Sequence, residues 1–195
     1  VDLKTAEGLD ILHRLAAGAD VFITNLPLSV RRRLRIDHET ICALNPRLVY
    51  GSFTAYGETG AEAEKTGFDS TAYWARSGLM DIVKPDHTSP PARSVAGLGD
   101  HPSAMTLFAA ITTALYRRER TGLGGLVSSS LLANGLWSSS CFAQAAWAPD
   151  ADFSTIPGQR ITTALYQTRD DRWLQFSMVR TEEQFDAMMV ALGCI

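Results

Sequence analysis

The sequence has few cysteines, and those it has show no pattern. Cys42, Cys141 and Cys194 are odd in number and far apart, and no Cys-x-x-Cys or Cys/His cluster accompanies them. Such spacing argues against a disulfide framework and against a zinc site, so we expect no metal. A reducing cytosol is the default compartment for such a chain, and we therefore expect a cytoplasmic protein.

Long apolar runs and a strong excess of charge are also missing. The net charge of -3 and the pI near 5.8 give no general reason to expect nucleic acid or a membrane as a partner. The longest mostly apolar stretch, residues 104–116, contains threonines and is too short to span a bilayer. The 195 residues, 46% of them hydrophobic, are enough for a folded core.

The first third of the chain alternates between helix and strand patterns. Thr5 is a good cap for a helix over 6–17, and Pro46 should end a helix that Asp37 opens. Apolar runs at 19–24 and 48–53 predict buried strands, with a short basic helix at 28–34 between them. Helix, strand, helix, strand at this spacing predicts an α/β fold with a parallel, Rossmann-like sheet.

The rest of the chain is expected to hold both structured and irregular segments. After a loop at 57–65 we expect a helix at 69–77, an irregular stretch at 81–99, and a buried central helix from Pro102 to about Arg120. A strand-to-helix passage should follow at 126–137. Residues 148–152 resemble a linker, and a hairpin at 161–167 and 173–179 should precede a helix from Thr181 to about 192. We therefore predict that residues 1–150 are part of a Rossmann-like domain and that 151–195 are a linker and the start of a smaller α+β domain.

Asp100 is the strongest candidate for chemistry. It lies in the run Gly97-Leu98-Gly99-Asp100-His101-Pro102, where an irregular segment turns into a long helix. Its simplest interpretation is an N-cap, because aspartate is a favoured capping residue. A helix N-terminus also stabilises an ionised carboxylate, and small neighbours would let a bulky substrate approach. Position alone leaves both interpretations open.

An ordered set of short motifs carries a family resemblance. The motifs are Val1-Asp2-Leu3-Lys4-Thr5-Ala6-Glu7-Gly8, Ala19-Asp20-Val21-Phe22-Ile23-Thr24-Asn25, Leu44-Asn45-Pro46-Arg47-Leu48-Val49-Tyr50, Gly57-Glu58-Thr59-Gly60, Gly67-Phe68-Asp69, Ser77-Gly78-Leu79-Met80 and Ala114-Leu115-Tyr116-Arg117-Arg118-Glu119-Arg120-Thr121-Gly122. In this order and spacing the chain resembles the family III CoA-transferases, a group that includes the α-methylacyl-CoA racemases. The resemblance is strong from residue 1 to about 135 and weaker beyond.

The resemblance implies a mechanism and a set of site residues. In the family's transferases, an aspartate at the position of Asp100 attacks an acyl-CoA thioester and carries the CoA to a carboxylic acid acceptor. Asp69 matches an acidic residue near the reacting centre. The expected CoA contacts are Lys4 and Arg33 with the phosphates, and Val1, Asn25 and Leu26 near the nucleotide. Taken alone, Lys4 could be a surface lysine and Arg33 part of a solvated basic helix face.

Departures from the family pattern shift the expected chemistry. Phe68 stands where the racemases have a histidine before the aspartate, so α-proton exchange lacks a partner base unless His101 replaces it. Transfer through an aspartyl intermediate is the leading hypothesis. An acyl-CoA racemase or isomerase and a non-catalytic CoA-binding fragment are the alternatives. Family members resemble interlocked homodimers, and because the chain opens with Val1 at what we expect to be a strand's end, we interpret it as an excerpt of a longer polypeptide.

Overall fold

The computed structural model describes residues 1–86, 88–150, 164–176 and 179–194. The chain divides into two compact units, Val1–Asp152 and Phe153–Ile195, and each is considered by itself. The expected linker at 148–152 and part of the expected hairpin, residues 161–163 and 177–178, reach outside the described residues. No described helix is both long enough and apolar enough to cross a membrane.

The first unit is built on a parallel sheet, as predicted. Its strands β1 (Val21–Thr24), β2 (Val49–Thr54) and β3 (Gly125–Ser130) lie in the order β1-β2-β3. Strand β2 is central and covered on both faces: Tyr50 packs into the core on one side of the sheet and Val49 into the core on the other. This double burial explains the unbroken apolar run at 48–50. Val1 and Asp2, expected at the end of a strand, belong to no strand.

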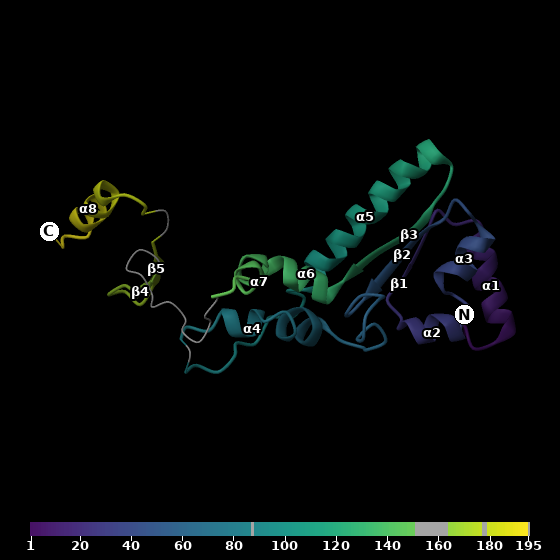
Figure 1. The fold of residues 1–195 in the computed structure, drawn as a ribbon, viewed down its shortest axis with the longest axis horizontal. Helices are drawn as coiled ribbons and strands as arrows, with labels where there is room; N and C mark the ends of the chain where they lie inside the picture. The colour runs from purple at the N-terminus through teal and green to yellow at the C-terminus, as the bar shows by residue number, and fades with distance from the viewer. Residues whose placement is uncertain (87, 151–163, 177–178, 195) are drawn as a thin grey trace. The chain divides into compact units, whose positions relative to one another are not determined.

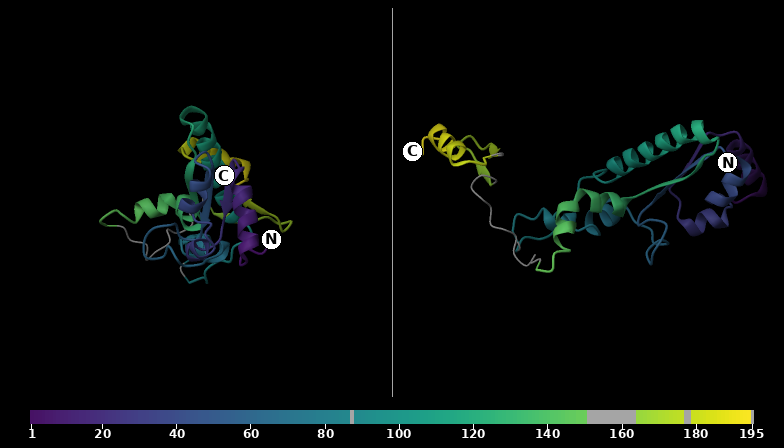
Figure 2. Two further views of the ribbon diagram at one scale, coloured as in Figure 1. Left: turned by 90° about the vertical axis from the view of Figure 1, so that its right-hand side faces the viewer. Right: turned by 45° about the horizontal axis from the view of Figure 1, so that its top comes forward.

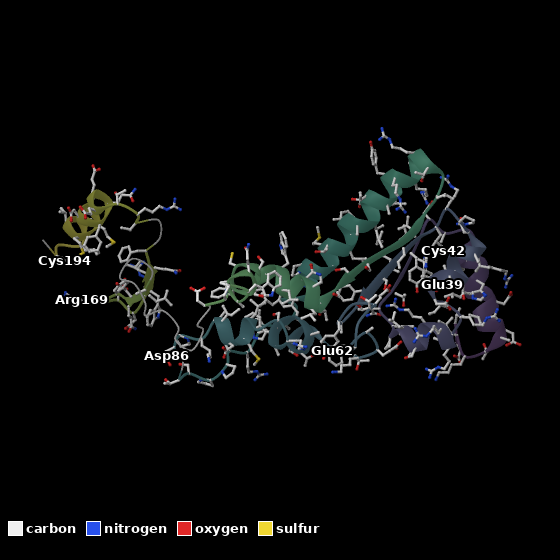
Figure 3. The ribbon with its side chains drawn as sticks, viewed as in Figure 1. Glu39, Cys42, Glu62, Asp86, Arg169 and Cys194 are labelled. Carbon is white, nitrogen blue, oxygen red and sulfur yellow. The ribbon has the colours of Figure 1, made fainter. Side chains whose placement is uncertain are left out.

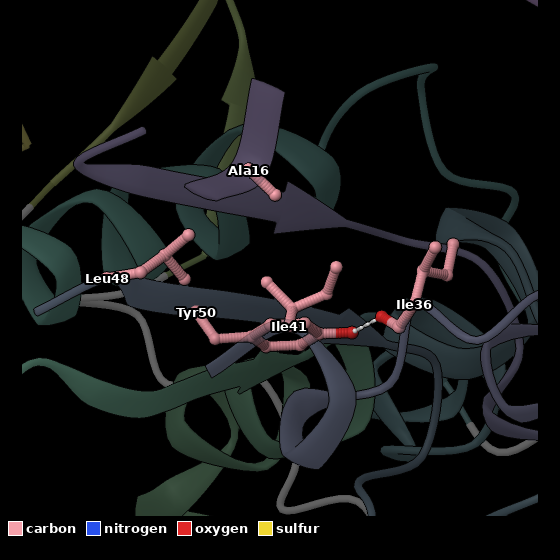
Figure 4. Close-up of a cluster of buried hydrophobic side chains, with 5 residues drawn as sticks. All are labelled: Ala16, Ile36, Ile41, Leu48 and Tyr50. Carbon is pink, nitrogen blue, oxygen red and sulfur yellow. Dashed lines mark hydrogen bonds between the residues drawn. The ribbon is translucent and has the colours of Figure 1, made fainter. Parts of the chain in front are cut away.

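Helices α1 (Ala6–Ala17), α2 (Leu28–Arg33) and α3 (His38–Leu44) lie on one side of the sheet (Figure 1). The predicted caps are present, because the side chains of Thr5 and Asp37 accept hydrogen bonds from the amides of Gly8 and Thr40. Between these helices and the sheet lies a core whose buried members are Ala16, Ile36, Ile41, Leu48 and Tyr50 (Figure 4).

Helix α5 (Asp100–Thr121) covers the other side of the sheet and runs beside β3 (Figures 1 and 2). It begins at Asp100, so Pro102 lies in its first turn, as predicted. The prediction of a buried central helix is wrong for one face: Met105, Phe108 and Tyr116 are exposed, because only the opposite face packs against β2 and β3. The predicted burial of β1 also fails at Ile23, which is 59% exposed because α5 packs over the other two strands.

Shorter helices complete the first unit. The segment η1 (Asp69–Ala75) was predicted as a helix and is a π-helix, in which the amide of Arg76 bonds to the carbonyl of Thr71, five residues earlier. It is followed by α4 (Leu79–Ile82), whose last two residues overlap the start of the stretch expected to be irregular. The predicted passage after β3 continues into α6 (Leu131–Ser138), and α7 (Ser140–Ala145) follows.

The described part of the second unit has mixed structure. Strands β4 (Leu165–Gln167) and β5 (Trp173–Gln175) form an antiparallel pair around the predicted turn. Helix α8 (Glu182–Ala191) starts with a capping box, in which Thr181 and Gln184 bond each other's backbone amides. The hairpin and helix therefore form where the sequence predicts them, and the role of 151–195 as the start of a smaller domain stays a prediction.

The buried hydroxyl of Tyr50 gives a test of the α1–α3 core. It donates a hydrogen bond to the Ile36 carbonyl at 2.7 Å (Figure 4). Tyr50→Phe leaves that buried carbonyl without its donor, and we expect the free energy of unfolding at pH 7 to fall by about 1–2 kcal/mol. Urea denaturation measures the loss. Tyr116→Phe, on the exposed face of α5, should leave the unfolding free energy unchanged.

The same residue should make stability depend on alkaline pH. Burial raises the pKa of Tyr50 from 10 to about 12. Because the folded pKa is raised, the neutral phenol stabilises the fold fully below pH 10, and this contribution is lost as the pH rises toward 12. Tyr50→Phe should lack this component of the alkaline loss. An identical alkaline profile in the wild type and the variant would contradict the assignment.

Candidate functional site

A cleft opens at the carboxyl ends of β1 and β2. It has a volume of about 690 Å³ and is lined by residues 25–28, 53–55 and 65–70, by the stretch leading into α5, and by Leu131 at the start of α6. The carboxyl ends of parallel strands are where open α/β sheets bind ligands. The cleft is lined by four of the seven predicted site residues: Asn25, Leu26, Asp69 and Asp100.

Asp100 is the first residue of α5 and is exposed to the cleft. The N-cap is Gly99, so the capping interpretation of Asp100 is wrong. Within the described residues the Asp100 carboxylate makes no hydrogen bond and no ion pair. The N-terminal end of a 22-residue helix stabilises a negative charge at this position. The Asp100 carboxylate therefore lies where a helix N-terminus stabilises negative charge, and no described residue occupies its oxygens.

Asp69 lies at the start of η1 and holds the residue before Asp100. Its Oδ1 accepts a hydrogen bond from the backbone N–H of Gly99 at 2.9 Å. Its Oδ2 is buried and has no hydrogen-bond partner among the described residues. A buried carboxylate oxygen without a donor is costly, and such groups are concentrated at functional sites. Asp69 thus positions the start of α5 through one oxygen and keeps the other buried without a partner among the described residues.

Close packing around Gly99 fixes this arrangement. A Cβ atom at residue 99 would lie 2.2 Å from Cγ of Tyr73. The Tyr73 ring is buried, and its hydroxyl shares a 2.8 Å hydrogen bond with the hydroxyl of Ser138. Only glycine therefore allows η1 and α5 to approach this closely.

The predicted CoA contacts fall into separate places. Asn25 and Leu26 line the cleft. Lys4 and Arg33 lie together in a second pocket of about 350 Å³, beside the N-terminus of α1. Val1, which is 81% exposed, lines neither the cleft nor this pocket. Two cations beside a helix N-terminus are suited to bind a phosphate group.

The two positions considered for a proton-transfer base, Phe68 and His101, differ in their relation to the cleft. Phe68, at the position of the racemase histidine, is exposed and lines the cleft. His101 does not line it: its ring lies against Gly97, where an added Cβ would be 3.0 Å from the imidazole Cε1. No histidine among the described residues therefore lines the cleft together with Asp69 and Asp100.

The sequence did not reveal that Lys65 and Arg93 line the cleft, or that Arg31 is buried. Lys65 and Arg93 line the cleft; Lys65 pairs with Glu62 at 2.8 Å, whereas Arg93 makes no hydrogen bond or ion pair with any described residue. In the basic helix, Arg31 is buried rather than solvated. Arg93 lies in a stretch without regular structure, where no periodic pattern in the sequence could indicate that it lines the cleft.

Cysteine and metal chemistry find no support in the described residues. Cys42 lies on α3, one turn after Glu39 (Figure 3), and burial together with the Glu39 charge raises the pKa of its thiol. Cys42 therefore stays protonated near neutral pH. No group of three or more His, Cys, Asp or Glu side chains within the described ranges could hold a metal ion.

Comparison with known proteins gives one consistent family. The profile of CoA-transferase family III matches residues 1–194. The cinnamoyl-CoA:phenyllactate CoA-transferase of Clostridium sporogenes is 34% identical, over 99% of this chain and 48% of its own length. The (R)-2-hydroxy-4-methylpentanoate CoA-transferase of Clostridioides difficile is 32% identical, over 92% of this chain and 45% of its own length. The chain thus spans about half the length of these relatives.

Two further similarities bear on activity and fold. The α-methylacyl-CoA racemase of Mus musculus is 27% identical over 97% of this chain and 50% of its own length. The crystal structure of a CaiB/BaiF family protein from Brucella suis matches with a TM-score of 0.81 and 26% identity, covering all of this chain and 51% of that one. Transferases and a racemase are therefore both among the similar proteins.

The Gly99–Tyr73 contact predicts a strong steric effect at the cleft. Gly99→Ala should lower the free energy of unfolding by about 1–3 kcal/mol, because the added methyl group forces η1 and α5 apart. The matched control is Gly18→Ala, whose φ of -101° is normal and whose added Cβ would have its nearest neighbour 3.9 Å away. Chemical denaturation of both variants measures the difference. Equal stability of the two variants would contradict the close packing.

Proposed function

Because the chain belongs to CoA-transferase family III, we propose that the full-length protein moves CoA between an acyl-CoA thioester and a carboxylic acid through a covalent intermediate on Asp100. The observation that carries this proposal is the Asp100 carboxylate, which is unpaired within the described residues, lies in the cleft and is supported by the N-terminus of α5. A carboxylate nucleophile must be accessible and free of a salt-bridge partner, and the exposure of Asp100 and its lack of a partner among the described residues support this role.

The first half of the reaction loads CoA onto Asp100. A carboxylate oxygen of Asp100 attacks the thioester carbonyl carbon, and the C–S bond breaks. CoA departs as a thiolate, and the acyl group and Asp100 are then joined as a mixed anhydride. The thiolate then attacks the side-chain carbonyl carbon of Asp100, and the donor acid leaves as a carboxylate. The product is an aspartyl-CoA thioester, and no net proton is transferred.

The second half runs the same steps with a new acid. The acceptor carboxylate attacks the aspartyl thioester carbon and displaces CoA thiolate, which gives a second mixed anhydride. The thiolate attacks the acceptor's carbonyl carbon, the new acyl-CoA forms, and Asp100 leaves as a free carboxylate. In this scheme Asp69 acts by holding the Gly99 amide, which precedes Asp100.

Binding of CoA involves both pockets in this proposal. Asn25 and Leu26 contact the nucleotide at the carboxyl end of β1, and Lys4 with Arg33 binds a phosphate group at the N-terminus of α1. Val1 is expected beside the nucleotide. The partners are an acyl-CoA, a carboxylic acid and a second subunit of an interlocked cytoplasmic homodimer.

The nucleophile is tested by removing only its charge. Asp100→Asn in the full-length protein should lower the rate of CoA transfer by at least ~10³-fold, because an amide cannot form the anhydride. CoA affinity should stay within about twofold of the wild type, since Asp100 contacts the acyl group rather than the nucleotide. Asp10→Asn, an exposed aspartate of α1, is the matched control and should leave the rate unchanged.

Chemical trapping separates transfer from the alternatives. Wild-type protein incubated with acyl-CoA and hydroxylamine should yield a hydroxamate at Asp100, detected by mass spectrometry. Solvent deuterium at the substrate α-carbon, without a hydroxamate, would instead support a racemase or isomerase. CoA binding with neither signal would support a non-catalytic CoA-binding protein.

The unpaired cation Arg93 supports a position for the acceptor. A carboxylate entering a cleft that already contains Asp69 and Asp100 is repelled unless a cation compensates its charge. Arg93→Gln should therefore raise the KM for the acceptor acid by roughly tenfold, the effect of one hydrogen bond to a charged group. Hydroxamate formation from the donor should be unchanged. Arg76→Gln, whose arginine pairs with Glu62 outside the cleft, should alter neither quantity, and an unchanged acceptor KM in Arg93→Gln would remove Arg93 from this role.

A further inference from the structure

Arg31 is the most deeply buried charged side chain among the described residues, with 2% of its surface exposed. Each of the five N–H groups of its guanidinium has an acceptor. Nε donates at 2.6 Å, Nη1 donates at 2.6 and 3.4 Å, and Nη2 donates at 2.8 and 3.4 Å; the acceptors are, in that order, Leu26 O, Ser52 Oγ, Glu58 Oε1, Phe53 O and Thr24 O. The side chain is therefore fully used in internal contacts.

Three of these acceptors are main-chain carbonyls of cleft-lining residues or of their neighbours. Thr24 and Leu26 flank Asn25, and Phe53 belongs to the lining itself. Thr24 is the last residue of β1 that pairs with β2, and Leu26 and Phe53 lie beyond the end of this pairing. Arg31 thus holds the main chain at the point where the pairing of β1 with β2 ends.

The other two arginines of the cluster differ in environment. Arg32 is exposed and pairs with Glu64 on the surface. Arg33 lines the pocket that also contains Lys4. Three consecutive residues of one type therefore have three separate roles, and only Arg31 reaches the main chain on both sides of Asn25.

We propose that Arg31 is a positioning residue for CoA binding: it fixes the main chain on both sides of Asn25, and so the part of the cleft that holds the nucleotide. The proposal rests on the proposed function in one respect, that CoA occupies this cleft. Arg31 contacts no substrate itself. Its loss should therefore weaken CoA binding while leaving the chemistry at Asp100 intact.

Lysine is the informative replacement because it keeps the charge. A lysine ammonium has three donors, so in Arg31→Lys at least two of the five acceptors lose their hydrogen bond from residue 31. The chain around Asn25 should then lose its fixed position. We expect the Kd for CoA to rise by about tenfold, the KM for the acyl-CoA donor to rise similarly, and kcat at saturation to change less than about twofold.

The experiment uses the full-length protein and calorimetric titration with CoA, below the unfolding temperature of every variant. Arg32→Lys, the neighbouring exposed arginine, should bind CoA as the wild type does. Leu107→Ala, in the core on the other side of the sheet, serves as a destabilised control. It should lower the Tm but leave the Kd for CoA unchanged, because general destabilisation alone does not disturb Asn25.

A milder pair of variants covers the case in which Arg31→Lys does not fold. Ser52→Ala removes one acceptor of Arg31 and should raise the Kd for CoA by about threefold. Ser139→Ala removes an equally buried hydroxyl at the start of α7 and should leave the Kd unchanged.

The outcomes separate the two proposals. Unchanged CoA affinity in folded Arg31→Lys, or an equal loss in Leu107→Ala, overturns the role of Arg31. If Arg31→Lys does not fold, unchanged affinity in Ser52→Ala overturns it. Wild-type protein that binds CoA but forms no hydroxamate contradicts the transfer chemistry, and the affinity comparison still decides the role of Arg31.

Discussion

The cleft depends on the hydrogen bonds of one buried arginine. Arg31 donates to carbonyls at the carboxyl ends of β1 and β2, and at the opposite end of these strands Arg118 donates to the carbonyls of Asp20 and Arg47. The first arginine comes from α2 and the second from α5, on opposite sides of the sheet. Directional bonds from both helical layers therefore hold the ends of two strands whose register is fixed by their own hydrogen-bond ladder.

Much of the fold could be predicted because local chemistry determines it. Thr5 and Asp37 are good caps, and they begin helices where the sequence places them. The apolar run at 48–50 indicates a strand covered on both faces, and β2 has a helical layer on each side. Such features depend on neighbours within a few residues, so one sequence is sufficient to find them.

The remaining features depend on contacts between distant segments. Nothing in the run Arg31-Arg32-Arg33 distinguishes the residue that is buried, because its acceptors lie up to 27 positions away. The contact of Asp69 with the Gly99 amide joins segments 30 residues apart. The prediction of a buried central helix for α5 also failed on one face, because the sequence does not show which face the sheet covers. The family resemblance could name Asp69 and Asp100, whereas the geometry between them required the structure.

The charges around the cleft are consistent with the proposed role of Asp100 as a nucleophile. Under that proposal, a salt bridge to Asp100 would occupy the oxygen that attacks the thioester. The N-terminus of α5 stabilises a negative charge there without a donor side chain on that oxygen, so the lone pairs remain free. Arg93 and Lys65 line other parts of the cleft, where the proposal has them compensate the charge of an entering acid. A helix N-terminus at the proposed nucleophile, with cations set apart for the proposed substrate, separates two requirements that one ion pair could not meet together.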